Sequence, residues 1–204
     1  MGITLINDQL IVSISREYAS GGKEIARDLA KRLGIGYYDR NMLDEIAAER
    51  LGNVDLLRKF DEVPRLFLKR TVRGMTSSPE ENVAQIQFDY LSKKAESGEA
   101  FVVVGRCADE VLSEYPGLVK IFILADEDQK AERVCQLRDC NLDEARGIML
   151  RHDKKRKAYH NYYCDIKWGD SRGYDICINS SRLGLVKTAD FLESYIRMRM
   201  IKHG

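Results

Sequence analysis

The residues best suited to chemistry in this chain lie near its start, in a short segment that joins two glycines to a lysine: Ser20-Gly21-Gly22-Lys23. Glycines let backbone amides approach a ligand closely, a hydroxyl adds a donor, and an ammonium adds a positive charge. Backbone N–H groups also converge where a loop enters a helix, which suits phosphate oxygens. The segment therefore predicts a phosphate site in which Lys23 faces the transferred phosphoryl group.

The segment departs from the general phosphate-loop pattern G-x-x-x-x-G-K-[ST]. It keeps only the second glycine and the lysine over residues 17–24, which read Glu-Tyr-Ala-Ser-Gly-Gly-Lys-Glu. The last of these, Glu24, could face Mg²⁺ directly or through water, because magnesium prefers hard oxygen ligands. Taken alone, the segment also fits an ordinary strand-to-helix turn with a solvated Lys23.

The pattern around this segment is that of a strand, a loop and a helix. Apolar residues recur at helical spacing from Ile25 to Leu33, and Gly34 follows where a C-cap glycine is expected. Apolar, β-branched runs predict five strands: residues 10–15, 36–39, 101–105, 119–124 and 174–179. Near-continuous apolar strands that alternate with amphipathic helices are typical of a parallel sheet covered on both faces. The predicted fold class is therefore α/β.

The composition is that of an ordinary globular protein, with 44% hydrophobic and 32% charged residues in 204. A net charge of +1 gives no general attraction to nucleic acid or membranes, so any anion site must be local. The five cysteines show no CxxC pairing, which is typical of reduced thiols. No apolar run approaches the roughly 18 residues of a membrane span, and no signal sequence is evident, so we expect a cytoplasmic protein without membrane association.

Beyond these patterns, the chain resembles the cytidylate kinase-like family of P-loop kinases over nearly its whole length. The resemblance lies in five blocks: residues 14–26 around the phosphate segment, Tyr37-Tyr38-Asp39-Arg40, Val103-Val104-Gly105-Arg106, Asp153-Lys154-Lys155-Arg156, and residues 162–181. It implies a three-layer α/β/α P-loop NTPase fold with a mainly parallel five-stranded sheet. The implied core is 1–39, 99–137 and 171–204, with a helical acceptor-binding insertion at about 40–98 and a lid at about 138–170.

The resemblance implies transfer of the γ-phosphoryl group of ATP to a nucleoside monophosphate, foremost CMP or dCMP, with Mg²⁺ bridging the phosphates. Phosphoryl transfer needs mostly positioning and charge neutralisation, and the chain offers cations at three separate places. The implied roles are these: Ser20, Gly21, Gly22, Lys23 and Glu24 bind the ATP phosphates; Asp39, Arg40 and Arg106 bind the acceptor; Lys23, Arg151, Asp153 and Arg156 are catalytic; and Glu24 meets the metal.

Several positions differ from the better-known cytidylate kinases. Cys107 stands where those kinases usually have aspartate, Glu45 where they have an arginine, and Met149 where they have a lid arginine. Two alternatives therefore stay open. The protein could be a P-loop kinase for a different small acceptor, or a non-catalytic regulatory protein that binds nucleotides.

Simpler roles also fit some of these residues. Arg106 could pair with Asp109 or Glu110, and Asp39 could cap the helix that follows it. The basic run 151–157 could be a solvated helix face, or with its neighbouring tyrosines an RNA-binding surface, although the near-neutral charge disfavours nucleic acid.

Two further features carry weaker expectations. His152 and His160 lie eight residues apart without metal-type spacing, so surface or packing roles are expected. The amphipathic segment 183–201 predicts a helix that covers the sheet, and its end could also support a homodimer.

Overall fold

The computed structural model describes residues 9–51 and 79–200. Its elements, in chain order, are β1 (Ile11–Arg16), α1 (Gly22–Leu33), β2 (Gly36–Tyr38), α2 (Arg40–Leu51), α4 (Pro79–Glu96), β3 (Phe101–Val104), α5 (Ala108–Val111), β4 (Leu118–Leu124), α6 (Glu127–Arg138), α7 (Leu142–Tyr163), the 3₁₀ turn η1 (Ser171–Gly173), β5 (Ile176–Asn179) and α8 (Ser180–Arg199). Within these ranges, strands alternate with helices as the sequence predicts.

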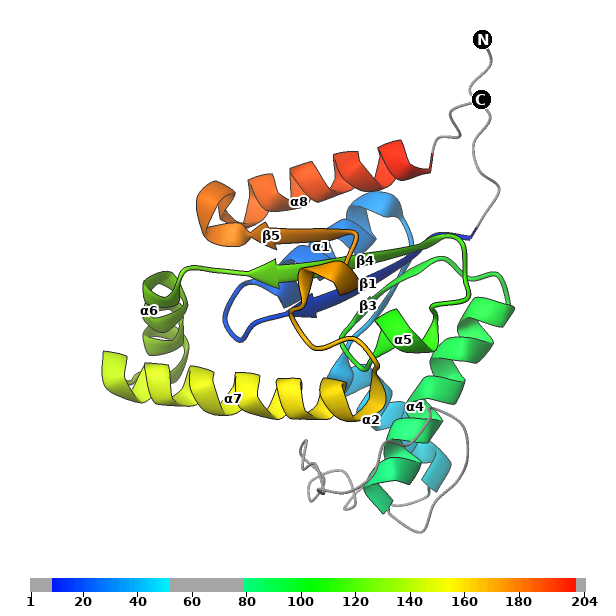
Figure 1. The fold of residues 1–204 in the computed structure, drawn as a ribbon, viewed down its shortest axis with the longest axis horizontal. Helices are drawn as coiled ribbons and strands as arrows, with labels where there is room; N and C mark the ends of the chain where they lie inside the picture. Colours follow the sequence, from blue (N-terminus) through cyan, green and yellow to red (C-terminus); the bar gives the residue numbers. More distant parts are fainter. Residues whose placement is uncertain (1–8, 52–78, 201–204) are drawn as a thin grey trace.

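The five strands form one parallel sheet in the order β2-β3-β1-β4-β5 (Figure 1). β1 is central, where Ile11 pairs with Phe101 on one side and Leu118 on the other. Because the strands are parallel, their carboxyl ends lie along one edge, where open α/β sheets bind ligands. The predicted α/β fold with five parallel strands is confirmed.

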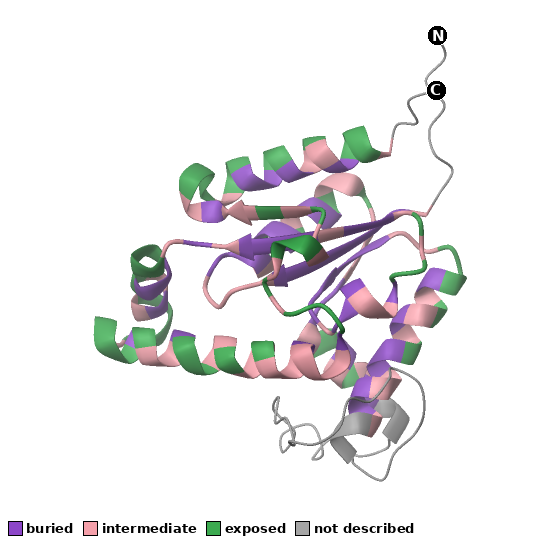
Figure 2. Ribbon diagram, viewed as in Figure 1, coloured by how far each residue is buried: buried purple, intermediate pink, exposed green. Residues whose placement is uncertain are grey.

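Apolar cores on both faces of the sheet hold the layers together (Figure 2). On one face, α1 and α8 pack against strand residues such as Val12 and Ile14. On the other face, side chains from α2, α4 and α5, including Leu43, Leu91 and Leu112, pack against β1 and β3. Burial on both faces explains why the strands read as continuous apolar runs.

Helices α6 and α7 leave the sheet after β4 and pack against each other. Asn141 caps α7 together with Glu144 in a capping box, which fixes where this long helix begins. Its register then places its later turns against the loop after β1.

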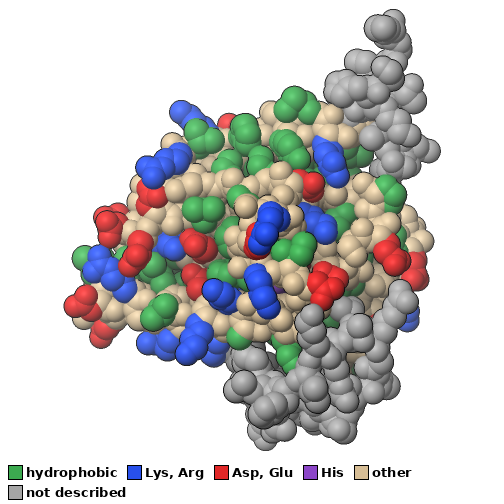
Figure 3. Space-filling model, in the orientation of Figure 1, with side chains coloured by type: hydrophobic (Ala, Val, Ile, Leu, Met, Phe, Trp, Pro, Cys, Tyr) green, Lys and Arg blue, Asp and Glu red, His purple; other side chains and the backbone are tan. Residues whose placement is uncertain are grey.

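Both signs of charge are mixed over the face shown in Figure 3. None of the helices in the described part of the chain combines the length and apolar composition that a bilayer crossing requires. The predicted insertion at 40–98 includes residues 52–78, which lie outside the described ranges, and the boundaries of insertion and lid stay predictions.

Candidate active site

The loop between β1 and α1 has the backbone geometry of an anion site. Gly21, with φ 77°, precedes the first turn of α1, and its carbonyl oxygen accepts a hydrogen bond from the Ile25 amide at an N–O distance of 3.0 Å. Within residues 9–51 and 79–200, the amides of Gly21, Gly22, Lys23 and Glu24 donate to no protein oxygen. These amides therefore lie at the positive end of a helix dipole, where phosphate oxygens can accept their hydrogen bonds.

Close neighbours leave no room for a side chain at either glycine of the loop. A Cβ on Gly21 would stand 2.2 Å from Leu185 Cδ2 of α8, and one on Gly22 would stand 2.6 Å from Arg16 Cβ. The Ser20 hydroxyl is turned inward, donating to the Glu17 carbonyl at 2.9 Å. The predicted hydroxyl of Ser20 is thus used within the loop, whereas the amides and Lys23 are the groups that a ligand can meet.

Lys23 forms an ion pair with Asp39 at the end of β2, with Nζ 2.8 Å from Oδ2. The other carboxylate oxygen accepts the Met42 amide at 3.2 Å, so Asp39 does cap α2. Burial acts to raise the pKa of Asp39, but hydrogen bonds from Lys23 and the Met42 amide outweigh it and lower that pKa below its ordinary value. Asp39 is therefore a buried carboxylate beside the loop lysine.

Glu17, at the position of the first glycine in the general pattern, has a buried counter-ion. Its Oε2 accepts a hydrogen bond from Lys130 Nζ at 2.7 Å and from the Ala125 amide at 3.3 Å. No sequence pattern pointed to Lys130, because the pair joins residues 113 positions apart. The pair ties the loop to the first turn of α6.

The expected metal ligand, Glu24, is exposed and belongs to no cluster of ligand groups in the described chain. The other carboxylates near the loop are already engaged: Glu17 by Lys130, Asp39 by Lys23, and Asp153 by a backbone amide. These residues therefore fit Mg²⁺ held by phosphate oxygens and water more than Mg²⁺ held directly by the protein.

Helix α7 packs directly on the loop. Asp153 Oδ1 accepts the Tyr18 amide at 2.7 Å, and the Tyr18 ring stacks on His152 with centroids 4.2 Å apart. Burial raises the pKa of Asp153. Arg156 lies over the Tyr18 ring and donates to the Arg16 carbonyl at 3.3 Å. Asp153 thus positions the loop, and Arg156 joins α7 to the last residue of β1.

Arg151, expected beside Arg156, is exposed and lines a different hollow with residues such as Arg138 and Asp139. Five residues along a helix turn the side chain by about 140°, so the two arginines face different sides of α7. The structure brings Arg156 to the site and leaves Arg151 outside it.

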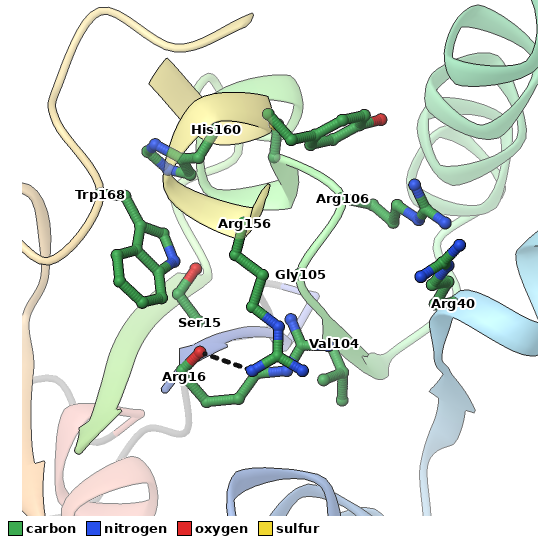
Figure 4. A pocket seen from close by; sticks show the side chains of 11 residues that line it. Ser15, Arg16, Arg40, Val104, Gly105, Arg106, Arg156, His160 and Trp168 are labelled. Carbon is green, nitrogen blue, oxygen red and sulfur yellow. Dashed lines mark hydrogen bonds between the residues drawn. The ribbon is translucent and has the colours of Figure 1, made fainter. Parts of the chain in front are cut away.

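Four arginines, Arg16, Arg40, Arg106 and Arg156, line one pocket at the carboxyl edge of the sheet (Figure 4). The cavity is small, about 30 Å³, and it is partly open to solvent. Ser15, Gly105 and Trp168 also line it. Four guanidinium groups around one small volume fit an anion with several oxygens, since arginine binds phosphate through paired hydrogen bonds.

The Arg106 side chain is largely buried, at 9% exposed. Its Nη2 donates to Asp44 Oδ1 at 2.9 Å, and its guanidinium lies 5.4 Å from the centre of the Tyr159 ring. Its Nε is buried and has no hydrogen-bond partner in the described chain. Pairing with Asp109 or Glu110, the simpler role that the sequence allowed, is wrong, because Asp44 of α2 takes that place.

Asp44 was not expected from the sequence, although its spacing of four from Arg40 on a helix was a signal. Besides the hydrogen bond from Arg106, its carboxylate accepts one from Arg40 Nε at 3.2 Å and one from Gln87 Nε2 at 2.6 Å. It therefore connects two pocket arginines to a fully buried glutamine of α4.

The comparisons with known proteins agree with this geometry. The model of the cytidylate kinase-like family matches residues 11–182. A search of curated proteins finds no match.

Among solved structures, an uncharacterized protein from Eubacterium ventriosum shares 36% identity with a TM-score of 0.74, covering 92% of this chain and 98% of that one. Two enzymes share the fold at low sequence identity. A shikimate kinase from Bacteroides thetaiotaomicron is 13% identical with a TM-score of 0.54, covering 92% of this chain and 98% of that one. A gluconokinase from Sinorhizobium meliloti is 12% identical with a TM-score of 0.52, covering 97% of this chain and 95% of that one. With the family model spanning most of its length, this chain belongs to the cytidylate kinase-like family of P-loop kinases.

Proposed function

We propose that the protein transfers the γ-phosphoryl group of ATP to the phosphate of a nucleoside monophosphate, most readily CMP or dCMP. Membership of the family supports a phosphotransferase, and the site supports the two-substrate arrangement. The observation that carries the proposal is the contact between the phosphate loop and the arginine pocket. Arg16 ends β1 immediately before the loop, packs beside Gly22 and also lines the pocket.

The donor phosphates would bind at the start of α1. The amides of residues 21–24 and the ammonium of Lys23 would take the β- and γ-phosphate oxygens, where the helix dipole adds to the positive charge. Lys23 would exchange its bond to Asp39 for one to the phosphate. Mg²⁺, when bound, supplies charge neutralisation between the phosphates, held chiefly by their oxygens and water.

The acceptor would bind in the pocket with its phosphate between Arg106, Arg40 and Arg156. A phosphate oxygen of the acceptor attacks the γ-phosphorus, and the bond to the β–γ bridging oxygen breaks to release ADP. An ionised phosphate needs no general base, so the protein mainly aligns the reactants and neutralises charge. Arg156, held between Tyr18 and the Arg16 carbonyl, stands between the two sites and would stabilise the migrating group.

A second candidate is phosphorylation of a hydroxyl group on a small acid. It is favoured by Asp39, whose carboxylate lies 2.8 Å from the Lys23 ammonium and could accept the proton of an attacking hydroxyl. In that case the arginines would bind the acid group of the acceptor.

One assay separates these candidates. ADP release from ATP would be measured with Mg²⁺ across all nucleoside monophosphates, and with shikimate and gluconate as hydroxyl acceptors. We expect the highest kcat/KM with CMP or dCMP; preference for a hydroxyl acceptor would favour the second candidate.

The variant that tests the role of Lys23 is Lys23→Ala, which should abolish turnover while the circular dichroism spectrum stays unchanged. Lys31→Ala is its control, since Lys31 is exposed in the last turn of the same helix. Equal loss in both variants, or full activity in Lys23→Ala, would contradict the proposal. ATP binding with no turnover on any acceptor would leave a nucleotide-binding regulator.

A further inference from the structure

A compact group of donor side chains adjoins the arginine pocket, and two of its members, Cys107 and His160, also line that pocket. The proposed phosphoryl transfer assigns no role to this group. Asp109 of α5, His160 of α7 and Cys164 just after α7 are all buried and bring one ligand atom each within 4.8 Å of one another. Cys107, also buried, belongs to the same packed cluster as Cys164. One carboxylate, one imidazole and two thiols therefore meet in the interior.

The hydrogen bonds of this group are incomplete. His160 Nε2 and Asp109 Oδ2 are 2.8 Å apart, but Asp109 Oδ1 and His160 Nδ1 are buried without a partner in the described chain. Most buried polar atoms in proteins are paired, and leaving one unpaired destabilises the fold. A ligand that accepts electron pairs from these atoms would remove that deficit.

The geometry points to a structural zinc site formed by Asp109, His160 and Cys164, with Cys107 as its fourth ligand. Sulfur and imidazole donors select Zn²⁺ over Mg²⁺ or Ca²⁺, which take oxygen ligands. Tetrahedral zinc places its ligand atoms about 3.3–3.8 Å apart, so side-chain rotations suffice to close the observed spacing. The spacing of four between His160 and Cys164 also falls within the range seen at zinc sites.

The ion would connect two segments that carry pocket residues. Cys107 and Asp109 directly follow Arg106, whereas His160 and Cys164 follow Arg156 on α7. A zinc ion would fix the end of α7 to the segment after β3 and so hold both arginines at the pocket. This inference is independent of the acceptor and of catalysis.

The test is a titration of metal-free, fully reduced protein with Co²⁺, whose absorption reports its ligands, and with Zn²⁺. We expect one equivalent of Co²⁺ to bind with a thiolate-to-cobalt charge-transfer band, and Zn²⁺ to displace it. Zn²⁺ should also raise the melting temperature. No charge-transfer band at one equivalent in the folded wild-type protein would overturn the inference.

Cys164→Ser should weaken Co²⁺ binding at least tenfold and lose the shift in melting temperature. Cys177→Ser is the matched control, because Cys177 is an exposed thiol on β5. His160→Gln, which keeps a polar side chain of similar size, provides a second test should the serine variant not fold. Wild-type affinity for Co²⁺ in either folded variant would overturn the inference.

Discussion

The carboxylate of Asp44 offers the sharpest test of how the arginine pocket is built. It holds Arg106 at 2.9 Å and Arg40 at 3.2 Å, and it also accepts a hydrogen bond from Gln87. The side chain of Arg106 is only 9% exposed and that of Asp44 is 22% exposed, so water could not easily solvate the Arg106 guanidinium if the Asp44 charge were removed. Asp44→Asn removes that charge with little change in shape.

Removing one partner of a fully buried ion pair costs about 3–5 kcal/mol, because the other charge stays buried and uncompensated. Asn keeps one acceptor oxygen and Asp44 is partly exposed, so we expect a loss of about 2 kcal/mol in the free energy of unfolding by urea. The control is Arg197→Gln, which breaks an exposed pair with Glu193 one helical turn away and should cost about 0.5 kcal/mol or less.

The same variant tests the acceptor site. With Arg40 and Arg106 no longer held together, the KM of the acceptor should rise about tenfold, or about 1.4 kcal/mol, whereas the KM of ATP should not change. A saturating acceptor should also recover part of the lost stability, since its phosphate supplies the missing negative charge. A stability loss no larger than that of Arg197→Gln, or equal changes in both KM values, would refute this reasoning.

Two further predictions concern the phosphate loop. Gly21→Ala should lower the free energy of unfolding by about 2–4 kcal/mol, because a positive φ strains alanine and its Cβ would overlap Leu185. The control is Gly34→Ala, with φ 66° and no atom within 4 Å of the added Cβ, which should lower that free energy by only about 1–2 kcal/mol. Equal losses in urea titrations would contradict this prediction. Since the pKa of Asp39 is lowered in the folded protein, its ion pair stabilises the fold above the unfolded pKa of about 3.9, and that stability is lost as the pH falls through the folded value. The difference in melting temperature between wild type and Asp39→Asn should therefore shrink from pH 5 to pH 2; a constant or growing difference would disprove it.

The fold could be predicted because its signals are local. Each strand is a short apolar run, and Gly34 and the residues from Ile25 to Leu33 mark one helix completely. The order of the strands, β2-β3-β1-β4-β5, was not predicted, because it depends on long-range packing. The loop between β1 and α1 stood out for a local reason too, since its glycines and lysine are adjacent in the chain, and its phosphate role stays a prediction.

The resemblance also named Arg40, Arg106 and Arg156, which line the pocket, but their partners could not be predicted, because these pairs lie far apart in sequence. Lys130 meets Glu17 across 113 residues, and Asp44 meets Arg106 across 62. No sequence signal gave Arg16 a role, whereas in the structure its guanidinium passes so close to Gly105 that a Cβ there would stand 2.5 Å from Nη1. His160 showed no metal-type spacing to His152; Cys164 follows it four residues later, whereas Asp109, 51 residues away in the chain, reaches it only through the packing of α7.

The carboxylates around this site explain how so many cations can stand together without a substrate. Asp39 faces Lys23, Asp44 faces Arg40 and Arg106, and Asp153 lies 3.7 Å from Arg156. Each carboxylate gives its cation the negative charge that a phosphate oxygen of a bound substrate would give it. Under the proposed function, a nucleotide would exchange one anion for another, so that binding would depend on the geometry of the phosphates more than on net attraction, in agreement with a chain whose net charge is only +1.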